Sequence, residues 1–381
     1  MRFLVLSNTA GNGHHAMGNA VIEQIKKDGH ETKIVDYLKP TKIRSKISHE
    51  WYFWFLAHFP KLSARIYDNL LNRDITKEKN FTLNFMTSSK KANQQIIDAI
   101  NEFQPDVIYC THVYTAYIIS EMKKKGELKK VLTFFIVSDY EIIPCMEFTT
   151  HIDYILTPTV DLHEKLLKMG FKEEQLILNG ITVNSKFSIH LDTKENTRSS
   201  LGLDKDLPTF LIMNGGIGFG NTLELLKEID KIENKNFQLI VVNGANVKMK
   251  DKIDSYLLEN PSLKCLNLGY STNVDVLMDA CDLLIGKIGG VAIAEAFNKG
   301  LPILVSGNAP FQEWSNVLYL GERNAILYAK NNKETKDHIE SLVSNPDKIN
   351  ELKENVKRIA MPNATKDFVN FIYSYLEKEG N

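Results

Sequence analysis

Residues 282–296 read DLLIGKIGGVAIAEA, and this stretch decides the fold class. The apolar run before Lys287 predicts a strand, and Gly289 and Gly290 predict the opening of a helix. The first amides of a helix have no partner within it, so they suit a diphosphate. Glu295 follows about one turn inside this helix, where its carboxylate can accept hydrogen bonds from ribose hydroxyls.

The chain beyond this helix adds amide side chains on a second helix. Residues 311–316 read FQEWSN, and Gln312 and Asn316 share one helix face because they are four positions apart. Amides in this arrangement suit sugar hydroxyls. A buried helix with a solvated glutamate is the plain alternative, and it does not explain why the two glycines, the glutamate and the two amides follow in this order.

Apolar segments alternate with amphipathic ones along most of the chain. The strand candidates of the first half are 3–7, 32–36, 107–111, 132–138 and 154–157. Those of the second half are 209–213, 238–243, 263–268, 283–285 and 302–305. Strands that alternate with helices predict parallel sheets covered on both faces. The sequence therefore predicts an α/β fold with two doubly wound, Rossmann-like domains.

A polar segment, residues 188–206, separates the two halves and is typical of an inter-domain linker. We expect a first domain over residues 1–190 and a second over 200–360. We also expect a C-terminal helix within 361–381, which could pack back on the first domain. The length of 381 residues agrees with this division, since a domain takes roughly 150 residues.

Glycine-rich loops follow the first strand of each half. In the second half Gly215, Gly216 and Gly218 lie between a strand and a helix, where bare backbone permits close approach of a phosphate. Gly11 and Gly13 occupy the same place in the first half. Two such loops favour a ligand-binding cleft that the two domains face.

The first loop, residues 11–16 (GNGHHA), has three interpretations. With Asp36 about 20 residues further on, it fits the dinucleotide fingerprint and favours NAD or FAD. It can also be a tight strand–helix turn without a ligand. In the third interpretation helix amides and His14 line a cleft for another ligand. His14 is then a candidate general base, because an imidazole titrates near working pH.

Residues 39–91 interrupt the alternation with a basic and aromatic segment. It holds eleven Lys or Arg residues against four acidic ones, and it includes the run WYFWFL at 51–56. Long insertions in compact domains are usually functional. An anionic membrane surface suits these charges, with Trp51, Trp54 and Phe55 at the headgroups. The alternative is that the aromatic side chains pack into the core and the lysines are merely solvated.

Composition excludes several classes of protein. The net charge is −1, whereas a dedicated nucleic-acid binder would normally be more basic. The four cysteines have neither disulfide-framework nor zinc-ligand spacing, which indicates buried thiols in a reducing compartment. We find no apolar run of about 18 residues, so no membrane span is expected. No metal site is expected either, and the motif Asp204-Lys205-Asp206 is interpreted as a solvated turn.

The order of these motifs resembles the family of monogalactosyldiacylglycerol synthases and processive diacylglycerol glucosyltransferases, over nearly the whole chain. That family is related to the transferase that adds GlcNAc to the undecaprenyl-linked peptidoglycan precursor. The matching segments are the loop with His14, PDVIYCTH at 105–112, SDY at 138–140, NGITV at 179–183, LGY at 268–270 and the stretch from 282 to Asn316. The resemblance implies the GT-B fold, with two Rossmann-like domains facing a cleft.

The resemblance also implies roles for particular residues. His14 would be the base or would orient the acceptor, and Gly11, Gly13, His112 and Asp139 would lie on the acceptor side. The UDP-sugar donor would be bound by Gly215, Gly216, Gly218, Tyr270, Lys287, Gly289, Gly290, Val291, Glu295, Gln312 and Asn316. Trp51, Trp54 and Phe55 would contact the membrane.

The implied reaction is the inverting transfer of a hexose from a UDP-sugar to a lipid acceptor such as diacylglycerol. The family needs neither a metal ion nor another cofactor, because helix dipoles and a cation hold the diphosphate. The protein would be cytoplasmic and would lie peripherally on the inner face of the plasma membrane, with no nucleic-acid partner.

Some positions depart from the family pattern. Ile288 stands where proline is usual, and Ala292 replaces a threonine that would contact the diphosphate. Thr182 replaces the proline of the turn at 179–183, and Ile143 and Met146 stand where the family has His and Trp. These last changes concern the acceptor more than the donor. Two other classes stay open: a UDP-sugar enzyme with a soluble acceptor or an epimerase, and an NAD-dependent oxidoreductase.

Overall fold

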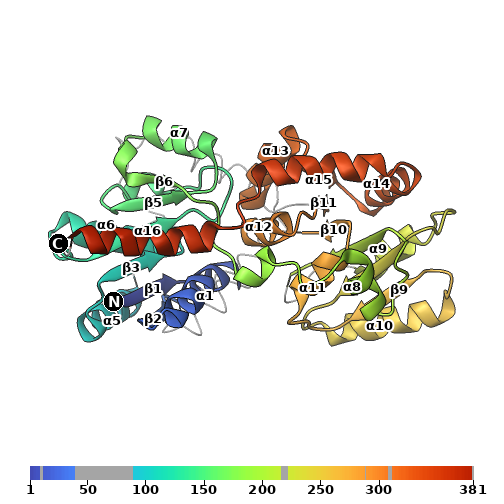
Figure 1. Ribbon diagram of the computed structural model, residues 1–381, viewed down its shortest axis with the longest axis horizontal. Helices are drawn as coiled ribbons and strands as arrows, with labels where there is room; N and C mark the ends of the chain where they lie inside the picture. Colours follow the sequence, from blue (N-terminus) through green and yellow to red (C-terminus); the bar gives the residue numbers. More distant parts are fainter. Residues whose placement is uncertain (9–11, 39–88, 216–221, 288, 308–310, 380–381) are drawn as a thin grey trace. The chain divides into compact units, whose positions relative to one another are not determined.

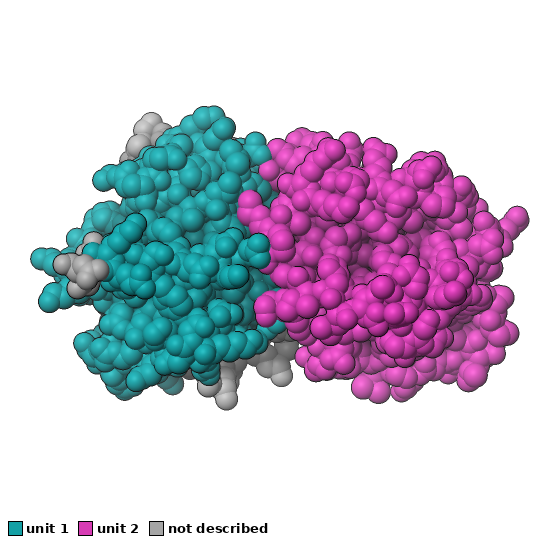
Figure 2. Space-filling model, in the orientation of Figure 1, with its two compact units in different colours: residues 1–184, 310–315, 363–381 teal, residues 185–309, 316–362 magenta. Residues whose placement is uncertain are grey.

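The computed structural model describes residues 1–8, 12–38, 89–215, 222–287, 289–307 and 311–379. The chain forms two compact units, coloured separately in Figure 2. The first comprises Met1–Asn184, Pro310–Ser315 and Asn363–Asn381, and the second comprises Ser185–Ala309 and Asn316–Pro362. Each unit contains one parallel six-stranded sheet with helices around it (Figure 1), so the predicted fold class is confirmed.

The sheet of the first unit has the order β2-β1-β3-β4-β5-β6. Its strands are β1 (Arg2–Ser7), β2 (Glu31–Asp36), β3 (Val107–Cys110), β4 (Leu132–Ile136), β5 (Tyr154–Thr157) and β6 (Leu176–Leu178). The helices of this unit are α1 (Asn12–Lys27), α5 (Lys90–Phe103), α6 (Val113–Lys124), α7 (Val160–Lys168) and α16 (Ala364–Glu379).

The sheet of the second unit has the order β12-β11-β10-β7-β8-β9. Its strands are β7 (Thr209–Met213), β8 (Gln238–Val242), β9 (Cys265–Leu268), β10 (Leu283–Gly286), β11 (Ile303–Ser306) and β12 (Ile326–Ala329). Its helices are α8 (Lys194–Ser200), α9 (Thr222–Ile229), α10 (Val247–Glu259), α11 (Val274–Ala280), α12 (Gly290–Asn298), α14 (Asn332–Ser344) and α15 (Asp347–Ile359). The residues of α13 (Phe311–Glu322) are divided between the units.

Central strands are buried along their whole length, as expected for parallel sheets covered on both faces. Every residue of β3, β4, β8 and β10 is buried. This explains why these strands are continuous apolar runs and not alternating patterns.

Two strands, β6 and β12, and the helix α8 were not predicted from the sequence. β6 and β12 are only three and four residues long and lie at the sheet edges, so their apolar signal is short. The segment 188–206, expected to be a linker, contains helix α8, which Thr193 caps by accepting a hydrogen bond from the Asn196 amide (3.3 Å). The residues of α8 are polar, so no apolar pattern indicated a helix.

Two glycines permit close approach within the units. A Cβ atom on Gly18 would lie 2.7 Å from Val5 Cγ1, so α1 can rest directly on β1. A Cβ on Gly286, which has φ +155°, would lie 2.1 Å from the Met213 carbonyl oxygen. Glycine is therefore required where β10 passes the end of β7.

The C-terminal helix α16 belongs to the first unit. Phe368 is fully buried, and its ring centroid lies 5.0 Å from those of Tyr109 and Phe134. The Asn179 side chain donates to the Ala364 carbonyl (3.1 Å), and Thr365 donates to the Val183 carbonyl (2.7 Å). Aromatic packing and hydrogen bonds thus attach the end of the chain to its N-terminal sheet.

Candidate active site

The strand orders place a topological switch point in each unit. β1 pairs with β2 on one side and β3 on the other, and β7 pairs in the same way with β8 and β10. Ligands of open α/β sheets bind beyond the carboxyl ends of the strands at such points. The residues that follow these strands are therefore the candidate site.

His14 lies in the first turn of α1, which begins at Asn12, so most of the predicted loop 11–16 is helical. Its Nδ1 lies 2.6 Å from the carbonyl oxygen of Thr111, directly after β3. A carbonyl oxygen only accepts, so Nδ1 must carry the hydrogen and donate it. In neutral His14 the lone pair is therefore on Nε2, which makes that atom available as a base.

Burial lowers the pKa of His14 to about 4, and the neighbouring charge of His15 acts in the same direction. The hydrogen bond to the Thr111 carbonyl opposes both effects by favouring the imidazolium. His14 is consequently neutral at physiological pH, with its lone pair on Nε2.

His112 caps the start of α6 and contacts His14. Its Nδ1 accepts a hydrogen bond from the Tyr114 amide (3.1 Å), and its ring centroid lies 4.7 Å from that of His14 at an interplanar angle of 72°. Burial, followed by the proximity of His14, holds the pKa of His112 well below its ordinary value. The structure thus brings together His14 and His112, two of the predicted residues of the first unit.

Two other predicted residues of this unit have simpler surroundings. Gly13 lies in the same first turn of α1 as His14. Asp139 follows β4, is almost completely buried, and accepts a hydrogen bond from the Ser138 hydroxyl (3.0 Å). Gly11, and the predicted membrane residues Trp51, Trp54 and Phe55, lie outside the described residues.

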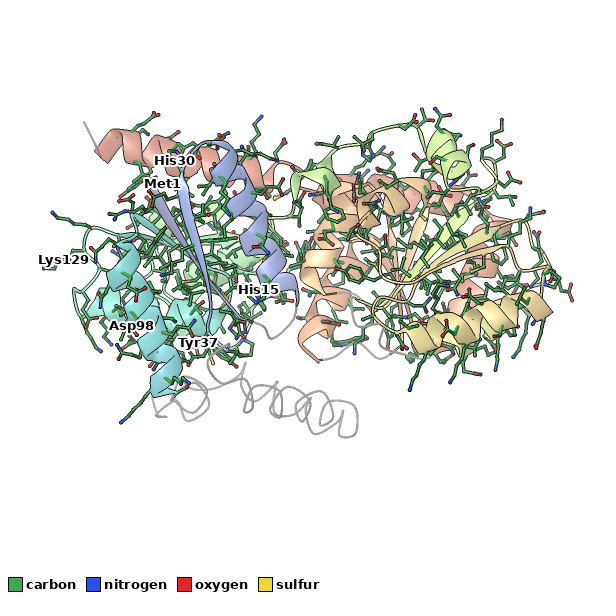
Figure 3. The ribbon with its side chains drawn as sticks, turned by 90° about the horizontal axis from the view of Figure 1, so that it is seen from below. Met1, His15, His30, Tyr37, Asp98 and Lys129 are labelled. Atoms are coloured by element: carbon green, nitrogen blue, oxygen red, sulfur yellow. The ribbon has the colours of Figure 1, made fainter. Side chains whose placement is uncertain are left out.

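Asp36, the acidic residue of the possible dinucleotide fingerprint, is occupied within its own unit. Its carboxylate accepts from the Leu38 amide (3.0 Å) and lies 3.5 Å from His15 Nε2. Figure 3 shows His15 and Tyr37 at the edge of the sheet where β1 and β2 end, opposite the edge that carries Met1 and His30. Asp36 therefore has contacts within its own unit, and its position about 20 residues after the glycine turn does not require a bound nucleotide.

In the second unit an asparagine joins the two loops at the switch point. Asn214, directly after β7, accepts a hydrogen bond from the Lys287 amide (3.2 Å) and donates to Thr222 (3.4 Å). Gly215 follows with φ +74° and open space beside it. Asn214 was not predicted as a site residue, although its position directly after a strand could have indicated one.

The start of α12 has the form expected of a diphosphate site. Gly289 is the N-cap residue and has no side chain with which to cap the first amides, which belong to Gly290, Val291 and Ala292. Lys287 is exposed beside this helix start. A cation and uncapped amides at one helix N-terminus form a favourable environment for an anion.

Glu295 lies on α12, and its carboxyl is partly buried. Burial raises its pKa to about 7; the Lys186 charge lowers it and the Asp275 charge raises it. Lys186, in the turn Ser185–Ser188, pairs with Asp275 (2.9 Å) and donates to the Thr272 carbonyl (2.7 Å). Lys186 and Asp275 were not predicted, because neither residue belongs to a motif.

The remaining predicted donor residues have different surroundings. Tyr270 follows β9 and is 72% exposed, whereas Asn316 on α13 is completely buried. Gln312 lies on the same helix as Asn316, as predicted, although its side chain is not described. Gly216 and Gly218 are outside the described residues.

Neither a metal cluster nor a membrane span is found in the part of the chain that the structure describes. No three His, Cys, Asp or Glu residues there are grouped so that they could hold a metal ion. Within the same ranges, no helix has both the length and the apolar character needed to cross a bilayer.

Comparison with known proteins identifies both halves of the chain. The family model of monogalactosyldiacylglycerol synthase matches residues 14–183, and that of the glycosyltransferase family 28 C-terminal domain matches residues 209–372. A processive diacylglycerol beta-glucosyltransferase of Bacillus licheniformis is 26% identical over 95% of this chain and 92% of its own length. A probable chloroplastic monogalactosyldiacylglycerol synthase of Glycine max is 25% identical, over 99% of this chain and 72% of its own length.

Solved structures share the fold over almost the whole length of the chain. The UDP-GlcNAc 2-epimerase of Neisseria meningitidis, bound to UDP-GlcNAc, superposes with a TM-score of 0.62 at 16% identity, over 98% of this chain and 100% of its own. At this identity the likeness concerns the fold alone. The chain therefore has the GT-B fold and contains a monogalactosyldiacylglycerol synthase domain followed by a glycosyltransferase family 28 C-terminal domain, and over most of its length it is similar to processive diacylglycerol glucosyltransferases and monogalactosyldiacylglycerol synthases.

Proposed function

We propose that this chain is an inverting glycosyltransferase that moves a hexose from a UDP-sugar to a lipid acceptor such as diacylglycerol. The observation that carries this function is the first-unit histidine with a fixed tautomer: Nδ1 of His14 is occupied by the Thr111 carbonyl, so Nε2 can accept a proton. The uncapped start of α12 beside Lys287 supports the donor side. The similar proteins named for diacylglycerol glycosylation support the acceptor class.

The chemical step needs one base and one stabilised leaving group. His14 Nε2 takes the proton of the acceptor hydroxyl while that oxygen attacks the anomeric carbon from the face opposite UDP. The bond between the anomeric carbon and the diphosphate oxygen breaks, and the configuration at the anomeric carbon is inverted. Lys287 and the amides of Gly289, Gly290 and Val291 stabilise the charge that develops on UDP. Because these groups are cationic or donate hydrogen bonds, we propose that no metal ion or other cofactor is needed.

The direct test measures UDP release from UDP-glucose and UDP-galactose, with and without diacylglycerol in vesicles, and repeats it with EDTA present. We expect release that depends on the lipid, forms a glycolipid and is unchanged by EDTA. Interconversion of UDP-sugars without lipid would instead indicate an epimerase. Tight NADH binding without UDP binding would favour the oxidoreductase.

The replacement Glu295→Gln is expected to weaken UDP-glucose binding by about tenfold or more at pH 8. A hydrogen bond to a charged group contributes about 1.5–3 kcal/mol, and glutamine lacks that charge. Because the pKa of Glu295 is raised to about 7, the ionised fraction of the wild type grows about tenfold between pH 6 and 8. Wild-type affinity should therefore rise across this range, and that of the variant should not. Titration calorimetry at several pH values measures both effects.

UDP-glucose is the ligand of choice because its phosphates do not titrate near neutral pH. Glu340→Gln is the matched control, since Glu340 lies on α14 with its side chain 48% exposed. It should bind as the wild type does at every pH. Equal affinity and an equal pH slope for wild type and Glu295→Gln would exclude Glu295 from the donor site.

We further propose that the protein lies peripherally on the inner face of the membrane, from the cytoplasmic side. Basic residues near an anionic surface contribute about 1 kcal/mol each, and residues 39–91 carry a surplus of seven positive charges. Co-sedimentation with anionic vesicles should accordingly be strong at low salt, weaker at high salt and absent with neutral vesicles. Combining Trp51→Ala with Trp54→Ala should reduce it further.

Tyr270→Ala is a suitable control for this experiment, because it removes an exposed aromatic side chain elsewhere. It should leave sedimentation with vesicles unchanged. A wild-type protein that ignores vesicles at every salt concentration would indicate a soluble acceptor.

A further inference from the structure

A single backbone segment, Thr111-His112, contacts His14 in two ways. The Thr111 carbonyl accepts from His14 Nδ1 (2.6 Å), and the His112 ring lies against the His14 ring with centroids 4.7 Å apart. Both residues come from the end of β3 and the start of α6, which form a rigid strand–helix junction. The orientation of His14 therefore depends on this junction as well as on its own helix.

Hydrogen bonds fix the tautomers of both rings. Nδ1 of His112 accepts from the Tyr114 amide (3.1 Å), so the hydrogen of neutral His112 is on Nε2. Nδ1 of His14 donates to a carbonyl, so the hydrogen of neutral His14 is on Nδ1. Of the two rings, His14 alone has its Nε2 lone pair available.

We propose that His112 is a positioning residue, which holds the His14 ring against the Thr111 carbonyl and keeps it dehydrated so that Nε2 remains the proton acceptor of the pair. This role rests on the proposed function, in which His14 is the base. It differs from contact with the acceptor, because His112 acts through His14. During transfer the proton resides on His14 Nε2, and His112 stays neutral.

Among the described residues, other titratable groups lie near this pair, and the Tyr114 ring is in contact with His112, with ring centroids 4.4 Å apart. His15 follows on the same helix, and Asp36 at the end of β2 lies 3.5 Å from it. Tyr373 of α16 lies at the other end of α1, where its hydroxyl donates to Asp28 (2.8 Å). Burial depresses the pKa of both His14 and His112, and the proximity of His14 lowers the pKa of His112 further, which disfavours a positive charge on His112.

The variant His112→Asn separates the positioning role from the capping role. Asparagine is a good N-cap, so its side chain can still accept from the Tyr114 amide and α6 can keep its start. The imidazole is lost, and water can reach His14. We expect the pKa of His14 to rise from about 4 toward the ordinary value of about 6.5.

Nitrogen NMR of the wild type and His112→Asn, with labelled histidine, tests this directly and needs no catalytic activity. The wild type should show His14 as the Nδ1–H tautomer, without titration between about pH 5.5 and 8. In the variant His14 should titrate within this range. A wild-type His14 that titrates near 6.5, or a variant titration unchanged from the wild type, would overturn the role of His112.

The pH profile of kcat supplies a second readout that a purely structural role would not change. Loss of activity in His112→Asn should be greatest at acidic pH, about fourfold at pH 6, and should become small near pH 8.5 because His14 is then deprotonated. An equal loss at every pH would contradict positioning. Wild-type enzyme that is inactive with every UDP-sugar would refute the proposed function, and the NMR result would still decide the role of His112.

Discussion

Replacement of His14 by alanine is expected to lower kcat by about 10²- to 10⁴-fold, which is the usual contribution of a general base. The affinity for UDP-glucose should be unchanged, because His14 belongs to the first unit, whereas Lys287, Glu295 and the start of α12 belong to the second. The physical reason is the fixed tautomer, because the Thr111 carbonyl holds the hydrogen of His14 on Nδ1 and leaves the lone pair on Nε2. The alanine variant loses this lone pair, and His112 does not replace it, since the hydrogen of neutral His112 is on its own Nε2. Steady-state kinetics with diacylglycerol vesicles and calorimetry with UDP-glucose measure the two quantities.

His15→Ala is the matched control for His14→Ala. It removes an imidazole from the next position of the same helix turn, and His15 is directed to Asp36 (3.5 Å) and not to Thr111. Its kcat should stay within about threefold of the wild type, because no proton transfer is assigned to it. Near-normal turnover of His14→Ala, with a melting temperature equal to that of the wild type, would reduce His14 to a structural residue.

Protonation of His14 should not lower the rate of the wild-type enzyme near neutral pH. A pKa of about 4 keeps its Nε2 unprotonated down to about pH 5, so protonation of this group reduces the rate only below that value. This behaviour differs from that of an ordinary exposed histidine, and burial is its main cause.

Much of the fold could be predicted because parallel sheets have a strong local signal. Segments such as Leu132–Ile136 and Gln238–Val242 are buried along their full length and therefore stand out as apolar runs between amphipathic ones. Edge strands carry less apolar surface, and β6 and β12 are too short to show a period. Helix α8 is mostly polar, since it presents few buried residues, so its sequence resembled a linker.

The candidate site was predictable as a set of residue types but not as a set of contacts. The glycine turn, His14, Lys287 and Glu295 could be recognised because spacing and side-chain chemistry are visible in a sequence. The Thr111 carbonyl could not be recognised, since every residue has one and only the fold brings this one to His14. The pKa of Glu295 likewise depends on burial, which motifs do not record.

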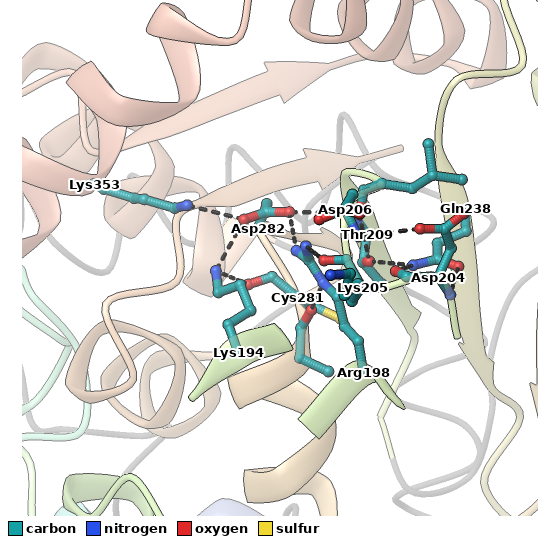
Figure 4. A network of polar contacts seen from close by, with 12 residues as sticks. Lys194, Arg198, Asp204, Lys205, Asp206, Thr209, Gln238, Cys281, Asp282 and Lys353 are labelled. Atoms are coloured by element: carbon teal, nitrogen blue, oxygen red, sulfur yellow. Dashed lines mark hydrogen bonds and ion pairs between the residues drawn. The ribbon is translucent and has the colours of Figure 1, made fainter. Parts of the chain in front are cut away.

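Asp282, which opens the deciding stretch of sequence, is expected to be a stability residue and not a site residue. It precedes β10, and so lies at the edge of the sheet opposite the carboxyl ends. Three cations surround its carboxylate: Lys194 at 2.8 Å, Arg198 at 2.5 Å and Lys353 at 2.9 Å. Figure 4 shows this network, which also includes the Thr209 amide, a donor to Asp282 (3.1 Å).

Asp282→Asn should lower the free energy of unfolding by about 3–5 kcal/mol, because removing one partner of a buried ion pair leaves uncompensated charge. Here three cations would remain, and the Arg198 side chain is only 7% exposed. Urea-induced unfolding followed by circular dichroism measures the loss at pH 7. Asp204→Asn is the matched control, since Asp204 and Lys264 form an exposed pair (3.8 Å) that should contribute less than about 1 kcal/mol.

The same network predicts how stability depends on pH. Burial alone would raise the pKa of Asp282, but Lys194, Lys353 and Arg198 together hold it well below its ordinary value. The carboxyl of the unfolded chain titrates near 3.8, so the folded protein keeps the full stabilisation above that pH and loses it as the pH falls further. Between about pH 5 and 3 the wild type should therefore lose more stability than Asp282→Asn. Parallel pH dependences for the two proteins would show that the cations do not stabilise the ionised carboxylate, and the sequence Asp282-Leu283 would then need another explanation.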